Sequence, residues 1–146
     1  MKNIIICLSL VLFVNLTVAA QDWQIDMTTA KELAQDNNKL IILVFQGSDW
    51  CAPCIKLDKE IWSTEEFKSY AAEHFVMLQA DFPKRKRNAL PQEQTIKNKK
   101  LAEQYNPKGY FPFVVVLNTS GKVLGQTSYK KLAPTKYIDL LESFKG

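Results

Sequence analysis

The fold of this chain is decided by residues 40–54, which read LIILVFQGSDWCAPC. The first six of them, Leu40 to Phe45, are all apolar, and an apolar run without alternation is typical of a central strand covered on both faces. The apolar pattern from Ile55 to Ile61 then favours a helix. The two motif cysteines, Cys51 and Cys54, therefore lie where a buried strand passes into a helix.

A Cys-x-x-Cys pair at such a junction can bind a metal, form a structural clip or exchange electrons. Thiolate metal sites normally use four ligands, but the only other cysteine is Cys7 and the only histidine is His74. The metal interpretation is therefore two ligands short. A structural clip would stabilise the fold only slightly, because the entropy of loop closure grows with loop length and this loop is minimal. Redox exchange is the chemistry that remains.

The helix that follows gives the two cysteines different tasks. If it begins at Cys51, that sulfur lies near unpaired N–H groups and the positive end of the helix dipole. These favour the thiolate over the thiol, whose ordinary pKa is about 8.5, so Cys51 is the predicted nucleophile. Cys54, one turn further in and more buried, is expected to resolve the mixed disulfide. Pro53 lies in the first turn, where it costs no helical hydrogen bond.

The first twenty residues differ in character from the rest of the chain. Lys2 precedes an apolar run from Ile4 to Val14, and the small residues Val18-Ala19-Ala20 end the segment. This pattern predicts a cleavable secretory signal peptide at residues 1–20 and one globular domain at residues 21–146. An uncleaved N-terminal anchor is the alternative. Cleavage would remove Cys7 and leave the motif pair alone, so the exported chain would have no structural disulfide framework.

Around the motif, the sequence alternates between strand and helix patterns. Strands are predicted at 23–27, 40–45, 75–81, 113–117 and 123–127, and helices at 29–37, 55–61, 63–74, 92–105 and 134–144. Capping boxes at Thr29–Glu32 and Ser63–Glu66 mark two of the helix starts. If the adjacent helices 55–61 and 63–74 are counted as one, the order is β-α-β-α-β-α-β-β-α. This order implies an α/β domain with a mixed central sheet and helices on both faces.

At this point the chain resembles the thioredoxin-like family, most of all the exported single-domain members of bacterial envelopes. The resemblance rests on the aliphatic strand, the Trp50–Cys54 motif with its helix, and Tyr110-Phe111-Pro112-Phe113 before a Val-rich hairpin. It covers residues 22–144 and implies the thioredoxin-like fold. It also implies that Pro112 is cis and faces the disulfide, which turns the backbone of Phe111 towards a substrate segment.

The sequence departs from thioredoxin itself near the motif and before the proline. Phe45 stands where thioredoxin has a buried aspartate that assists proton transfer to the resolving thiol, and Asp58 stands where some envelope relatives have an acid instead. Asp58 is therefore a candidate for that role, against the simpler interpretation of a solvated charge. Phe111 is bulkier than the usual residue before the cis-proline, and Trp50 is expected to shield the motif and dock substrate.

The stretch from Lys84 to Lys100 is strongly basic, with seven positive residues against Glu93. A basic cluster can indicate a nuclear address or a nucleic-acid surface. In an exported chain without an aromatic-interleaved basic face, it is interpreted as a solvated insertion. A contact with an acidic partner or a membrane surface is the alternative.

These observations predict an exported, periplasmic thiol–disulfide oxidoreductase. A reductase of protein disulfides is favoured, because Ala-Pro between the cysteines resembles the reducing Gly-Pro type. No metal or organic cofactor is expected. The expected partners are disulfide-containing proteins and a thiol-protein electron donor, which can be membrane-embedded; no nucleic acid is expected, and the chain is expected to be a monomer. The alternative is a non-catalytic thioredoxin-like module that binds partners or carries a metal such as copper.

Overall fold

The computed structural model describes residues 20–146. The predicted signal peptide, residues 1–20, therefore lies outside the described residues except for Ala20, and Cys7 lies outside them too. Within the described part of the chain, no helix combines the length and the apolar character needed to cross a membrane.

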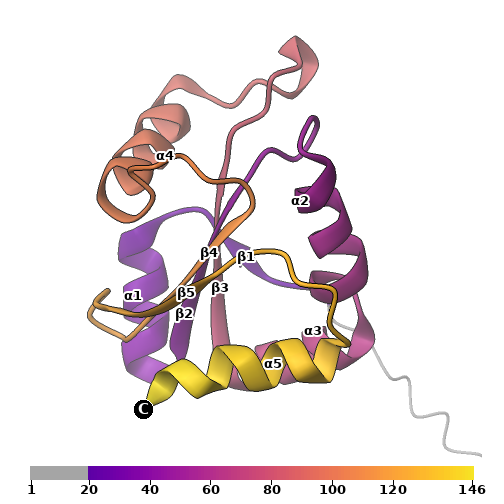
Figure 1. Cartoon of the computed structure of the whole chain (residues 1–146). Coiled ribbons are helices and arrows are strands. Elements are labelled where there is room, and N and C mark those ends of the chain that lie inside the picture. The colour runs from indigo at the N-terminus through magenta and orange to yellow at the C-terminus, as the bar shows by residue number, and fades with distance from the viewer. Residues whose placement is uncertain (1–19) are drawn as a thin grey trace, which may run out of the picture.

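A five-stranded sheet forms the centre of the domain, in the order β1-β3-β2-β4-β5 (Figure 1). Its strands β1, β2 and β3 are parallel, and β4 and β5 run antiparallel to their neighbours. The strands are β1 (Trp23–Gln24), β2 (Leu40–Gln46), β3 (Phe75–Asp81), β4 (Phe113–Leu117) and β5 (Val123–Thr127). The helices are α1 (Met27–Asn37), α2 (Ala52–Leu57), α3 (Glu65–His74), α4 (Gln92–Tyr105) and α5 (Pro134–Glu142). The predicted mixed α/β architecture is confirmed.

The unalternating sequence of β2 follows from its position between two cores. Ile42 and Val44 belong to a core shared with α3 and α5, whereas Ile41, Leu43 and Phe45 belong to one shared with α1 and α4. Figure 1 shows α1 and α4 on one side of the sheet and α2 and α3 on the other. Because successive strand side chains point to opposite faces, a strand covered on both faces must be apolar throughout.

The first helix begins earlier than the capping box predicted. The side chain of Asp26 accepts hydrogen bonds from the N–H groups of Thr28 (3.0 Å) and Thr29 (3.1 Å), so α1 begins at Met27 and the first strand ends at Gln24. An aspartate oxygen at the N-cap satisfies N–H groups that a helix start leaves unpaired. The predicted start at Thr29 and the predicted strand through Met27 are therefore wrong.

The helix after the motif also differs from the prediction. The α-helix ends at Leu57 and continues as a π-helical turn, η1 (Asp58–Trp62), in which the N–H of Ser63 donates to the carbonyl of Asp58 over 2.8 Å. Thr64, rather than Ser63, then caps α3, since its hydroxyl accepts from the N–H of Phe67. The extra residue in the turn helps to bring the fully buried Ile61 and the nearly fully buried Trp62 into the core.

Candidate active site

The two cysteines lie between the carboxyl end of β2 and the start of α2, and they form a disulfide with a Cα–Cα distance of 5.2 Å. Cys51 is the N-cap of α2 in extended conformation, with its carbonyl accepting from the N–H of Ile55 over 3.1 Å. Its sulfur is therefore attached to the residue that begins the helix, as the electrostatic argument requires. In the disulfide the two side chains are equally buried, with 4% and 3% of their surface exposed, so the predicted difference in burial is absent.

Trp50 and Phe111 are brought together beside this disulfide motif. Their ring centroids are 5.5 Å apart in an edge-to-face contact, and Phe82 makes a similar contact with Phe111 at 5.5 Å. Trp50 remains 38% exposed. The predicted docking residues thus belong to one aromatic cluster, which consists of Trp50, Phe82 and Phe111. Phe82 was missed by the sequence argument, because it lies in what was interpreted as a loop.

Pro112 immediately precedes β4, and the Phe111–Pro112 bond is cis, as the resemblance implies. Its carbonyl accepts a hydrogen bond from the hydroxyl of Ser128 over 2.7 Å. A groove of about 520 Å³ lies beside this bond, and its lining includes Phe111, Pro112 and Ser128. The groove offers room for an extended segment beside the residue that precedes the proline.

Asp58 and Cys54 line the same cavity, which has a volume of about 310 Å³. Two part-buried glutamines complete its polar wall, with the amide of Gln46 donating to the side-chain oxygen of Gln79 over 3.0 Å. Asp58 is exposed and accepts a hydrogen bond from the hydroxyl of Ser63 over 3.2 Å. The structure therefore places Asp58 and Cys54 on one cavity, while Phe45 lies in the apolar core of the opposite face. In the sequence, the two glutamines are marked only by following the apolar runs of β2 and β3.

Asp49, the residue before Trp50, connects the motif to the loop that follows β3. Its carboxylate accepts hydrogen bonds from the N–H groups of Lys84 (2.9 Å) and Arg85 (3.0 Å) and from the amide of Asn88 (2.9 Å). These donors, the Lys84 N–H above all, hold the pKa of Asp49 below its ordinary value. In the sequence, Asp49 is one residue between the apolar run and the motif, and no local pattern marks this role.

His74 takes no part in this site. Its ring stacks on Tyr70 at 4.1 Å at the end of α3. Among residues 20–146 there is no group of three or more histidine, cysteine and acidic side chains placed to hold a metal ion.

Comparisons with known proteins agree with this geometry. A family model described as thioredoxin-like matches residues 22–119. The disulfide bond reductase DsbH of Chlamydia pneumoniae is 37% identical over 114 residues, which is 78% of this chain and 67% of that protein.

The solved structures include a DsbH oxidoreductase with a TM-score of 0.79 and 34% identity, covering 86% of this chain and 85% of that one. A disulphide isomerase from Xylella fastidiosa, at 23% identity and a TM-score of 0.60, shares the fold, covering 82% of this chain and 88% of that one. With the Cys51–Cys54 disulfide at the strand–helix junction, the two matches to DsbH proteins indicate a DsbH-like thiol–disulfide oxidoreductase. The chain belongs to the thioredoxin-like family.

Proposed function

We propose that this protein is a periplasmic reductase of protein disulfides that works as a monomer through Cys51 and Cys54. The observation that carries the proposal is the disulfide between these residues, set between the carboxyl end of β2 and the start of α2. Thiols in this arrangement exchange disulfides directly, so the reaction needs no metal and no organic cofactor.

In the proposed reaction, the Cys51 thiolate attacks one sulfur of a substrate disulfide, which forms a mixed disulfide and releases the other substrate sulfur as a thiolate. The Cys54 thiolate then attacks the sulfur of Cys51, which re-forms the protein disulfide and releases the second substrate thiol. Two electrons and two protons pass from the protein dithiol to the substrate. A thiol-protein donor, which can be membrane-embedded, returns them.

The neighbouring residues have distinct proposed roles. Trp50 and Phe111 form the apolar wall against which the substrate segment docks, with Pro112 opening the groove beside it. Asp58 accepts the proton that Cys54 loses when it becomes a nucleophile, since both line one cavity. Pro53 lies in the first turn of α2, where its missing N–H leaves the helical ladder intact.

The direction of electron flow is supported by two observations. The residues between the cysteines are Ala52 and Pro53, so no histidine lies there to stabilise the Cys51 thiolate. In addition, a protein that is 37% identical in sequence is named a disulfide bond reductase. The dithiol form is therefore expected to be a good electron donor. The opposite direction, oxidation of substrate thiols, requires a dithiol more stable than the disulfide.

Two measurements test this function. Equilibration of the Cys51–Cys54 pair with dithiothreitol buffers should give a potential nearer the value of about −270 mV of thioredoxin than the value of about −120 mV of a strong oxidant. Insulin reduction driven by dithiothreitol should be accelerated by the protein and not by Cys51→Ser. A potential near the value of about −120 mV of a strong oxidant would identify an oxidase. A protein that does not accelerate insulin reduction would favour the alternative function, a binding or metal-carrying module.

Export is part of the same proposal. We infer that residues 1–20 are a signal peptide and that residues 21–146 are the mature domain. Expression of the full chain in a Gram-negative host should give a periplasmic protein whose N-terminus is Gln21. A protein that keeps Met1 and sediments with membranes would instead carry an uncleaved anchor.

A further inference from the structure

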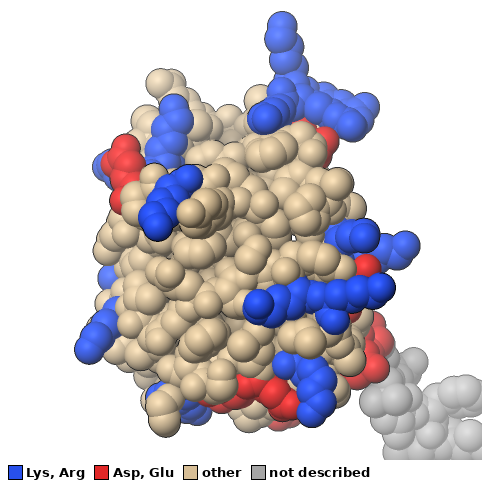
Figure 2. All heavy atoms as spheres, in the orientation of Figure 1, with Lys and Arg blue, Asp and Glu red and all other residues tan. Residues whose placement is uncertain are grey.

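The loop between β3 and α4, residues 82–91, carries four consecutive cations beside the redox motif. Lys84, Arg85, Lys86 and Arg87 are all exposed, and none of them has an acidic partner within 4 Å among residues 20–146. In Figure 1 this loop extends from the top of the domain next to the start of α2. Figure 2 shows lysine and arginine side chains projecting from the surface in that region. We name residues 82–91 the basic loop.

The basic loop is bonded to the residues that precede Cys51. The carboxylate of Asp49 binds the N–H groups of Lys84 and Arg85, and the indole N–H of Trp50 donates to the carbonyl of Phe82 over 2.7 Å. The ammonium group of Lys84 lies 3.8 Å above the centre of the Trp50 ring, which is a favourable cation–π geometry. The first half of the loop is thus held against Trp50.

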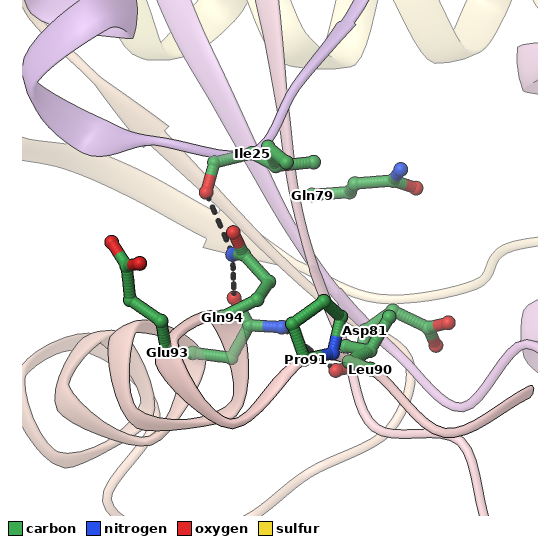
Figure 3. A pocket seen from close by; sticks show the side chains of 8 residues that line it. Ile25, Gln79, Asp81, Leu90, Pro91, Glu93 and Gln94 are labelled. Atoms are coloured by element: carbon green, nitrogen blue, oxygen red, sulfur yellow. Dashed lines mark hydrogen bonds between the residues drawn. The ribbon is translucent and has the colours of Figure 1, made fainter.

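The start of α4, which follows the loop, is itself bonded to neighbouring segments, and Figure 3 shows the bond from Gln94 to Ile25. The side-chain amide of Asn98 donates to the carbonyl of Asp81 over 2.9 Å, and that of Gln94 donates to the carbonyl of Ile25 over 2.9 Å. Leu90 and Pro91 line the small cavity next to these bonds. Since the N–H groups of Lys84 and Arg85 and the amide of Asn88 are all bonded to Asp49, the cations of the loop keep a defined position relative to Cys51, which lowers the entropy cost of binding to them.

The three other lysines of the basic stretch lie on α4 and differ from one another. Lys97 pairs with Asp26 at 3.2 Å and with Glu93 at 3.1 Å, so its charge is neutralised on the surface of α4. Lys99 and Lys100 are exposed and have no acidic partner within 4 Å among residues 20–146, but they lie outside the loop that is bonded to Asp49 and Trp50. The loop is exposed, as a solvated insertion would be. Its bonds to Asp49 and Trp50 nevertheless hold it beside the redox motif.

We propose that the basic loop docks an acidic segment of the protein whose disulfide Cys51 attacks. This inference rests on the proposed disulfide exchange and names the class of substrate: a protein with several aspartate or glutamate residues close to its disulfide. Opposite charge accelerates encounter and orients the partner, and the loop adjoins Trp50, so a segment bound there brings its disulfide to Cys51. An anionic membrane is the weaker candidate, because a bilayer on this loop would cover the face that substrate must reach.

The experiment uses two synthetic peptides that contain the same intramolecular disulfide, preceded by four glutamates in one and four glutamines in the other. Reduced protein is mixed with each peptide, and the rate constant for peptide reduction is measured at low and high salt. The loop variant R85Q/K86Q/R87Q keeps Lys84 on Trp50 and all backbone N–H groups. The control K99Q/K100Q/K145Q removes the same charge from exposed positions on α4 and near the C-terminus. The neutral reagent 2-hydroxyethyl disulfide reports intrinsic reactivity.

We expect the native protein and the control to reduce the glutamate peptide about tenfold faster than the glutamine peptide at low salt, which corresponds to about 1.4 kcal/mol. The ratio of the two rate constants should approach one in the loop variant at low salt. It should approach one in all three proteins at about 1 M salt, where the screening length is about 3 Å. Reactivity with 2-hydroxyethyl disulfide should be equal in all three proteins.

Equal rates with both peptides in the native protein, or the same ratio in the loop variant as in the control, would overturn the inference while leaving the redox function intact. Failure to reduce 2-hydroxyethyl disulfide would instead overturn the redox function itself. Phosphatidylglycerol vesicles that bind the native protein but not the loop variant, together with an absent peptide preference, would assign the loop to a membrane surface.

Discussion

Trp50 and Phe82 lie 32 residues apart in the chain and are joined by a hydrogen bond of 2.7 Å from the indole Nε1 to a main-chain carbonyl. This bond connects the residue before Cys51 to the first residue of the basic loop. The same indole contacts Phe111, which precedes the cis-proline. Trp50 therefore links three separate segments around the disulfide.

Replacing Trp50 with phenylalanine should loosen the basic loop. The new ring retains contact with Phe111 but has no N–H for the carbonyl of Phe82, so the free energy of unfolding should fall by about 1 kcal/mol. Amide hydrogen exchange within residues 82–88 should become faster. Tyr105→Phe is the matched control, because it removes a hydrogen bond to the carbonyl of Gly121 in the β4–β5 turn. Slow exchange in the loop of Trp50→Phe would show that this bond does not hold it.

Asp49 should stabilise the loop in a pH-dependent manner. The N–H donors of Lys84 and Arg85 lower its pKa in the folded protein, so its contribution to stability is complete above the unfolded-state pKa of about 3.9 and is lost as pH falls through the lower folded value. Asp49→Ala should therefore be less stable than the native protein at pH 7, and the difference should shrink towards pH 2. Urea unfolding at both pH values measures it.

The control for Asp49→Ala is Asp36→Ala, at an exposed aspartate of α1, which should change stability little at either pH. A stability difference for Asp49→Ala that persists unchanged at pH 2 would mean that the side chain acts by packing and not by its charge.

Cys51 should be the thiol that reacts first in the reduced protein. Its position at the N-terminus of α2 favours the thiolate, whereas Cys54 lies within the helix. Brief treatment with iodoacetamide at mildly acidic pH, followed by mass spectrometry of peptides, should find the label on Cys51. Label mainly on Cys54 would reverse the assignment of nucleophile and resolving thiol.

Asp58→Asn should slow the second step of the exchange and spare the first. The amide cannot accept the proton of the Cys54 thiol across the shared cavity, so release of a mixed disulfide at Cys51 should slow at neutral pH. Stopped-flow kinetics resolve the two steps. Glu66→Gln, which changes an exposed acid on α3, should match the native protein in both. If Asp58→Asn also matches it from pH 6 to 8, the proton passes directly to solvent.

Several features could be predicted because the signal is local. An apolar run such as Leu40–Phe45 requires cover on both faces, and the bounds of β3, α4, β4 and β5 follow from breaks in hydrophobic period. The Cys-x-x-Cys spacing at a strand–helix junction predicts the redox pair by itself. The start of α1 was misplaced, because two cap signals compete within four residues and the side chain of Asp26 makes the bonds.

The sequence by itself thus determined the sheet, the redox pair and the positive charge of the loop. Only the tertiary structure decided where the loop lies, because the bonds of Asp49 and Trp50 span 32 to 39 residues and form once β2 and β3 lie side by side. The same pairing brings Gln46 and Gln79 to the cavity of Cys54 and Asp58. Contacts of this range leave no periodicity in a sequence, since each partner is selected by the geometry of the sheet.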